Sequence, residues 1–234
     1  MHPIDKAARI AGALYLSLVV TGIFCLMYVP EKLIVRGNAA ATAANIVAHE
    51  SLFRIGIVVE LLSTVIFILV VMALYGLLSS VSIIQASYMA VLALVSSAVA
   101  FLNVLNSIAA LPLFRGAEFL SVMEKPQRDA LGMLFLRLHG QGSVINEIFW
   151  GLWLLPFGIL VMRSGFLPRI LGVLLIVNCF AWIGVSLTSL LQAPFASIVN
   201  RYAFIPETGE MWIMLWLLIM GAKVAPPLPA VATS

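Results

Sequence analysis

Six apolar stretches, the last of them short, occupy most of the chain. The predicted spans are residues 8–29, 52–78, 84–111, 140–162, 170–191 and 210–222. A helix that crosses a bilayer needs about 20 predominantly apolar residues, and a helix satisfies its backbone polar groups internally, as the bilayer requires. The sequence therefore predicts an all-α integral membrane protein, built as a bundle of about six transmembrane helices.

The composition excludes an ordinary soluble protein. Hydrophobic residues make up 63% of the chain and charged residues 10%, whereas soluble domains are roughly a quarter charged. The net charge of +3 comes from scattered basic residues, which set the orientation of membrane proteins. Without a basic tract, we expect the lipid bilayer as partner and no nucleic acid. Cys25 and Cys179 lie inside apolar runs, where we expect them to pack without forming a disulfide.

The connectors alternate between long segments of mixed charge and tight turns. The amino-terminal segment, the tight Arg163 to Arg169 turn and the carboxyl-terminal end carry Lys6, Arg9, Arg163, Arg169 and Lys223 against the single acid Asp5. Because basic residues in short loops dominate orientation, we expect both termini in the cytoplasm and the protein in the inner (plasma) membrane. Residues 1–224 are expected to form one transmembrane domain, and the Pro- and Ala-rich residues 225–234 a disordered tail.

The long connectors lie on the extracytoplasmic side and are expected to be partly helical. Asn38 is a helix N-cap candidate for residues 39–50, and residues 124–138 have the apolar spacing of an amphipathic helix. Pro30 is expected to end the first span, since proline breaks helices. Pro156 is expected to kink the fourth.

Ionisable and amide side chains recur at similar depth in several predicted spans. A rise of about 1.5 Å per residue places Glu60 and Asn103 about 12 Å, and Glu147 about 10 Å, below the outer surface. A carboxylate at such a depth must pair, take up a proton or meet water. The ligand-binding candidates are Glu60, Glu147, His139, Asn146, Asn103, Asn106, Arg54 and Arg137.

Two interpretations of these polar groups stay open. Arg54 and Arg137 lie on the same spans as Glu60 and Glu147, so the carboxylates could form structural ion pairs that join the second and fourth spans. Alternatively, they line a water-filled vestibule in the outer half of the bundle that binds a polar or cationic ligand. The small and hydroxyl residues beside Asn103 fit close helix packing equally well. Helix packing also best explains the glycines of the spans, Gly12, Gly22, Gly151, Gly158 and Gly172.

Motifs for a metal or for catalysis are missing from the sequence. It contains no phosphate-binding glycine loop, no nucleophile elbow and no His-Glu-x-x-His. A site of His49, Glu50, His139 and Glu147 is geometrically conceivable, but zinc sites usually use closer ligands or several histidines. We therefore expect no metal and no cofactor.

Five stretches carry a resemblance to a known family. They are Arg9-Ile-Ala-Gly-Ala-Leu-Tyr-Leu, Ala41-Thr-Ala-Ala-Asn-Ile, Glu50-Ser-Leu-Phe-Arg-Ile-Gly, the Leu138-His139 segment, and Ser164-Gly-Phe-Leu-Pro-Arg-Ile-Leu-Gly-Val-Leu, the most specific of them. In these stretches the chain resembles a bacterial multi-pass membrane family catalogued as domain of unknown function 4386. The resemblance implies an integral membrane protein of about this length and supplies no activity and no catalytic residue.

Three functions are compatible with these features. The leading hypothesis is a non-enzymatic membrane protein that binds a small ligand or lipid in the vestibule, since Glu60, Asn103, Asn146 and Glu147 share one depth. An alternative is an intramembrane hydrolase that uses His139 with Glu60 or Glu147 as acid and base. A third is a small-solute transporter, against which stands the lack of a repeated pair of broken helices.

Overall fold

The computed structural model describes residues 3–192, 194–195, 198–199, 202 and 208–222. These residues form helices and turns, and no strand occurs among them. The tail from Ala225 onward lies outside the described residues. The helices are α1 (Pro3–Ile23), α2 (Val29–Leu33), α3 (Ala39–Ala48), α4 (Glu50–Leu78), α5 (Ile83–Arg115), α6 (Lys125–Leu152), α7 (Leu154–Arg163), α8 (Arg169–Leu190) and α10 (Gly209–Ile219), with a π-helical turn η1 (Phe24–Tyr28) and a 3-10 turn η2 (Glu118–Leu120).

Five helical segments in the described part of the chain are long and apolar enough to cross a membrane. They are Pro3–Leu33, Glu50–Leu78, Ile83–Arg115, Lys125–Arg163 and Arg169–Leu190. They confirm the predicted all-α membrane protein. The sixth predicted span is the short helix α10, whose 11 residues extend about 16 Å at about 1.5 Å each, less than the roughly 30 Å core of a bilayer.

The first helix runs further than predicted. Pro30 was expected to end it, and this prediction is wrong. The helix continues from α1 through η1 into α2, and it ends at Leu33. Pro30 stands in the first turn of α2, where a proline is tolerated because its missing N–H would have no partner in a new helix. The π-helical turn before it lets the chain stay helical.

The amphipathic segment 124–138 and the span 140–162 were expected to be separate, but α6 joins them without a break. It begins with a capping box in which Glu124 and Gln127 exchange hydrogen bonds, and it is interrupted at Trp153. The interruption lies three residues before Pro156, whose ring nitrogen cannot bond the carbonyl of Leu152. Pro156 thus disturbs this segment as predicted. The Asn38 cap of α3 is also confirmed, since Ala41 N donates to Asn38 Oδ1 at 2.9 Å.

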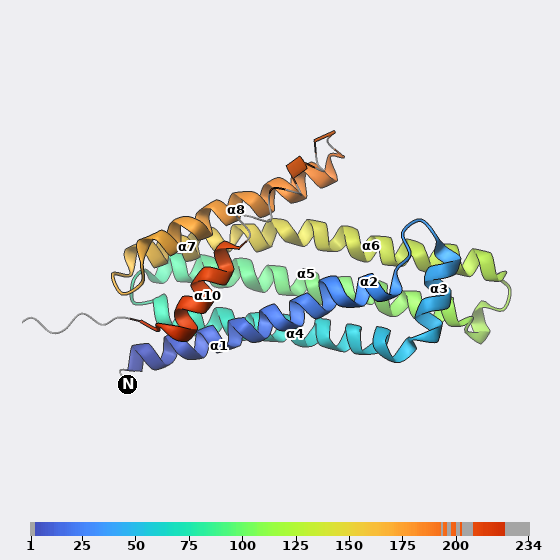
Figure 1. Ribbon diagram of the computed structural model, residues 1–234, viewed down its shortest axis with the longest axis horizontal. Helices are drawn as coiled ribbons and strands as arrows, with labels where there is room; N and C mark the ends of the chain where they lie inside the picture. The colour runs from blue at the N-terminus through green and yellow to red at the C-terminus, as the bar shows by residue number, and fades with distance from the viewer. Residues whose placement is uncertain (1–2, 193, 196–197, 200–201, 203–207, 223–234) are drawn as a thin grey trace, which may run out of the picture.

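The long helices lie side by side along the length of the molecule (Figure 1). α5 packs between α4 and α6, α1 packs on α4, and α8 packs on α6 and α7. α10 lies against α1 and α8. α1 begins and α10 ends at the same end of the bundle, while α3 lies at the other end (Figure 1). Both ends of the described chain are therefore on one side.

Two hydrophobic cores lie at different levels of the bundle. The larger one surrounds Trp153, Phe157 and Leu74, near the start of α1. The smaller one surrounds Ile46 and Phe114, near α3. In α1, α4 and α5, the residues between these two cores include the hydroxyl, amide and carboxyl side chains of the spans. This intermediate level is where the candidate site lies.

Glycines allow several helices to approach closely, as expected. A Cβ on Gly12 would lie 2.4 Å from the Leu218 backbone of α10, and Gly158 and Gly172 face each other between α7 and α8. The prediction is wrong for Gly22, where a Cβ would have no heavy atom within 4 Å. Gly22 borders the central cavity instead.

Candidate functional site

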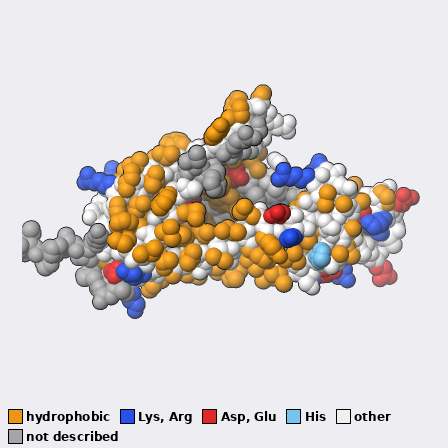
Figure 2. Space-filling model, viewed as in Figure 1, with side chains coloured by type: hydrophobic (Ala, Val, Ile, Leu, Met, Phe, Trp, Pro, Cys, Tyr) orange, Lys and Arg blue, Asp and Glu red, His pale blue; other side chains and the backbone are white. Residues whose placement is uncertain are grey.

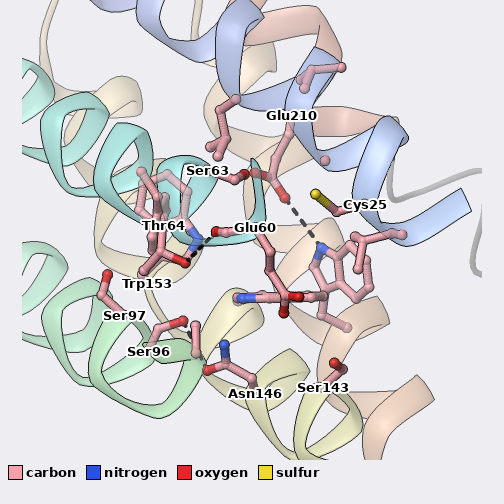
Figure 3. Close-up of a pocket in the computed structure, with 18 of the residues that line it drawn as sticks. Cys25, Glu60, Ser63, Thr64, Ser96, Ser97, Ser143, Asn146, Trp153 and Glu210 are labelled. Carbon is pink, nitrogen blue, oxygen red and sulfur yellow. Dashed lines mark hydrogen bonds between the residues drawn. The ribbon is translucent and has the colours of Figure 1, made fainter. Parts of the chain in front are cut away.

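A cavity of about 310 Å³ lies in the middle of the bundle. Residues of α1, α4, α5, α6, α8 and α10 line it, and Figure 3 shows the polar ones at close range. Its ionisable and amide members are Tyr15, Cys25, Glu60, Asn103, Asn146 and Glu210. Figure 2 shows a surface that is largely apolar on this face and hollowed beneath α8. The site is thus a cavity with mostly apolar walls and a few polar groups inside the bundle.

Glu60 pairs with His139 across one side of the cavity. Glu60 Oε1 on α4 lies 2.8 Å from His139 Nε2 on α6. Both side chains are largely enclosed, at 23% and 21% exposure. Glu60 and His139 also both line a smaller cavity of about 60 Å³, which lies toward α2. The pair therefore lies at the partition between the two cavities.

Asn103 fastens α5 to α6 next to this pair. Its Nδ2 donates to the His139 carbonyl at 2.8 Å, and Asn106 Nδ2 donates to Asn103 Oδ1 at 3.2 Å. This approach requires glycine at position 142, because a Cβ there would lie 2.1 Å from Asn103 Oδ1. Gly142 thus has a local role that its neighbour Gly140, with no heavy atom near its Cβ position, does not share.

A buried hydrogen bond connects the same two helices deeper in the bundle. Ser96 Oγ donates to Asn146 Oδ1 at 3.0 Å (Figure 3), and both residues are almost fully buried. Ser186 Oγ on α8 donates to the Val144 carbonyl at 2.6 Å. Buried polar groups are costly unless they are bonded, so these bonds hold α5, α6 and α8 in one register around the cavity.

Glu210 forms a second carboxylate centre, which the sequence did not predict. It accepts hydrogen bonds from the Tyr15 hydroxyl, from Asn178 Nδ2 at 3.1 Å and from Trp182 Nε1 at 3.2 Å. These donors belong to α1 and α8, so Glu210 fixes α10 against both helices. The available signal was an acid at the start of the apolar run 210–222, together with an amide, Asn178, inside the predicted span 170–191.

Aromatic rings form much of the remaining wall. Trp153 stacks on Phe157 at a centroid distance of 5.4 Å and meets Phe67 edge-on at 5.3 Å. Trp150 and Trp182 make a second edge-on contact at 5.4 Å. Packed aromatic rings thus supply much of the apolar surface around the cavity.

Two irregular points of the helices border this cavity. Cys25 in the π-helical turn η1 lines it, as does Trp153 at the break between α6 and α7. Turns of π-helix and helix breaks occur frequently at functional sites. The irregular backbone of the spans thus coincides with the cavity.

Five of the predicted site residues lie at the cavity or beside its lining. Glu60, Asn103 and Asn146 line the cavity, while His139 and Asn106 bond to members of that lining.

The other three predicted candidates lie outside the cavity lining. Arg54 donates through Nε to Glu50 Oε1 at 2.7 Å, so this ion pair lies within the second span and does not join it to the fourth. Glu50 and Arg54 lie one helical turn apart on α4, so their side chains are neighbours. Arg137 is exposed on α6, and Glu147 is half-buried there. The site therefore includes fewer of the candidate residues than the sequence predicted.

In the part of the chain that the structure describes, His, Cys, Asp and Glu side chains do not gather in threes that could hold a metal ion. The conceivable set of His49, Glu50, His139 and Glu147 is not brought together: His49 is exposed, Glu50 bonds to arginines, and His139 bonds to Glu60.

Comparison with known proteins gives one match. A family model described as "Domain of unknown function (DUF4386)" matches residues 10–221. No curated protein and no solved structure matches the chain. The matched residues extend from the first turns of α1 to the end of α10, and so include every helix that lines the cavity.

Proposed function

We propose that this chain, which belongs to the DUF4386 family, binds a small ligand or a lipid inside its helical bundle. The observation that carries this proposal is the 310 Å³ cavity, which brings polar groups from five helices together. Ligand sites are typically cavities of about 300–1,000 Å³ with mostly apolar walls and a few polar groups that orient the ligand. This cavity has such walls and polar groups, and its volume lies at the lower end of that range.

The lining indicates the chemistry of the ligand. Carboxylates only accept hydrogen bonds when ionised, and Glu60 and Glu210 supply such acceptors on different helices. The rings of Trp150, Trp153 and Trp182 supply apolar contact area. A matching ligand has a compact apolar body and at least one hydroxyl or amine donor, as a small polar-headed lipid does.

The charge distribution supports a cytoplasmic location of both termini in the inner (plasma) membrane. Lys6 and Arg9 in α1, Arg163 at the end of α7 and Arg169 at the start of α8 flank the spans at one end of the bundle. Basic residues in short loops face the cytoplasm. Cysteine-accessibility labelling of single cysteines at Lys6 and Glu118 tests this: the membrane-impermeant reagent should label intact cells at 118 and not at 6.

A second candidate function, an intramembrane hydrolase, is favoured by the Glu60–His139 pair, because a histidine and a carboxylate can exchange a proton. Ser143 on the same helix donates to the His139 carbonyl at 3.2 Å, which gives its hydroxyl a partner other than the imidazole ring. The binding function accounts for more of the lining, including Glu210 and the tryptophans. Loss of a measured hydrolysis in a His139→Gln variant would favour the hydrolase.

The experiment that tests binding uses two glycines of the spans. A leucine at position 22 would extend from the cavity border, whereas one at Gly76 would meet open space away from it; neither Cβ has a heavy atom within 4 Å. Protein purified in mild detergent is denatured, and the released small molecules are quantified by mass spectrometry. We expect one compound in about molar proportion to wild type and to Gly76→Leu, and its loss from Gly22→Leu. Equal amounts in both variants, or no such compound in wild type, would refute the proposal.

A further inference from the structure

A separate groove lies on the outside of the bundle between α4 and α5. It has a volume of about 740 Å³ and shares no lining residue with the central cavity. Arg54, Ile57 and Val58 of α4 line one side, and Ile108, Leu111 and Arg115 of α5 line the other. The proposed cavity function does not involve this groove.

The apolar part of the groove faces outward along two spans. Val58 is 62% exposed and Ile108 46% exposed, and both lie in helical segments long enough to cross the membrane. In a bilayer, exposed side chains at such positions contact acyl chains. A groove between them provides a track in which one chain can lie.

The polar end of the groove carries two arginines. Arg54 lies near the start of α4 and Arg115 is the last residue of α5, so both stand near one end of their spans. Their side chains are 55% and 53% exposed, and both bond to the single carboxylate oxygen Glu50 Oε1, at 2.7 and 3.3 Å. Two guanidinium groups with one carboxylate leave a formal charge of +1.

Arginine suits a phosphate group at this place. A guanidinium has five N–H donors, and the bonds to Glu50 use Nε of Arg54 and Nη1 of Arg115. Its planar arrangement of donors matches phosphate oxygens. The groove therefore combines an acyl-chain track with a cationic end.

We propose that this groove binds one anionic phospholipid. Its phosphate lies between Arg54 and Arg115, and one acyl chain runs along Ile57, Val58 and Ile108. The charge of the arginines selects anionic over zwitterionic headgroups, and the apolar track selects a lipid over a soluble phosphate.

The test measures lipid binding to delipidated full-length protein by native mass spectrometry. Phosphatidylglycerol is compared with phosphatidylcholine of the same chains, and glycerol 3-phosphate serves as the soluble anion. We expect a roughly fivefold preference for phosphatidylglycerol, the usual effect of one net positive charge at the membrane surface on anionic lipids, and no binding of glycerol 3-phosphate at the same concentration. The preference should persist in Arg137→Gln, whose arginine is exposed on α6 outside the groove.

Two variants test the two halves of the groove. The Arg54→Gln, Arg115→Gln double variant should lose the preference for phosphatidylglycerol. Val58→Trp, which fills the apolar track without changing a charge, should weaken the binding of phosphatidylglycerol. All three positions are well exposed, and the thermal unfolding midpoint reports whether each variant folds. Equal binding of the two lipids by wild type overturns the proposal, as does a preference retained by the folded double variant or binding of glycerol 3-phosphate as strong as that of the lipid.

Discussion

The carboxylate of Glu60 and the imidazole of His139 meet at 2.8 Å although 79 residues separate them in the chain. Glu60 belongs to α4 and His139 to α6, and both helices pack on α5. Because Asn103 of α5 bonds to the His139 carbonyl, the three helices are connected at one level. This connection closes one side of the central cavity, and its integrity is the first feature to test.

Replacing Glu60 with leucine should lower stability. The imidazole of His139 would lose its partner in a largely enclosed place, and an unsatisfied buried group costs about 1–3 kcal/mol. Glu60→Gln should cost less, because an amide can still bond the ring. The measurement is the thermal unfolding midpoint in detergent, with the exposed Glu118→Leu as control. A Glu60→Leu variant as stable as this control would show that the pair contributes nothing.

Two glycines of α6 should respond oppositely to alanine. At Gly142 a Cβ would lie 2.1 Å from Asn103 Oδ1, so Gly142→Ala must displace the amide and separate α5 from α6. We expect a destabilisation of about 1–3 kcal/mol, the usual cost of overpacking. At Gly140 the space is open, so Gly140→Ala should leave the unfolding midpoint unchanged or raise it, since alanine favours helix. Equal midpoints for the two variants would contradict the described contact.

Removing the Tyr15 hydroxyl should loosen α10. Tyr15 is 2% exposed and its hydroxyl donates to Glu210, and hydrogen bonds to charged groups contribute about 1.5–3 kcal/mol. Tyr15→Phe should therefore lower the unfolding midpoint and speed proteolysis within residues 208–222. Tyr28→Phe, at a tyrosine that is 46% exposed, serves as control. Identical proteolysis of the two variants would argue against the role of Glu210 in fixing α10.

Much of the fold follows from the sequence, because membrane spans need long apolar runs and little else. The starts of α4, α5 and α8 lie within two residues of the predicted spans. The errors arose where local signals conflicted with helix continuity. Pro30 could enter a new helical turn after a π-helical one. The amphipathic residues 124–138 form the first part of α6 and continue without a break into the predicted span.

The site was predictable in part, for a physical reason. Depth counting found Glu60, Asn103 and Asn146, because helical rise relates position along a span to depth. It could not find Glu210, whose environment is built by Tyr15 and Asn178 from distant parts of the chain. It also could not show that Arg54 turns toward Glu50, since depth gives no direction around the helix axis.

The most direct test of the central claim is an experimental density map of the protein purified with its native lipids. The account predicts density for a small molecule in the cavity, between Glu60, Glu210 and Trp153 and distinct from the side chains, with Glu60 still bonded to His139. A cavity closed by repacked side chains, or one that holds only ordered water in every preparation, would contradict it.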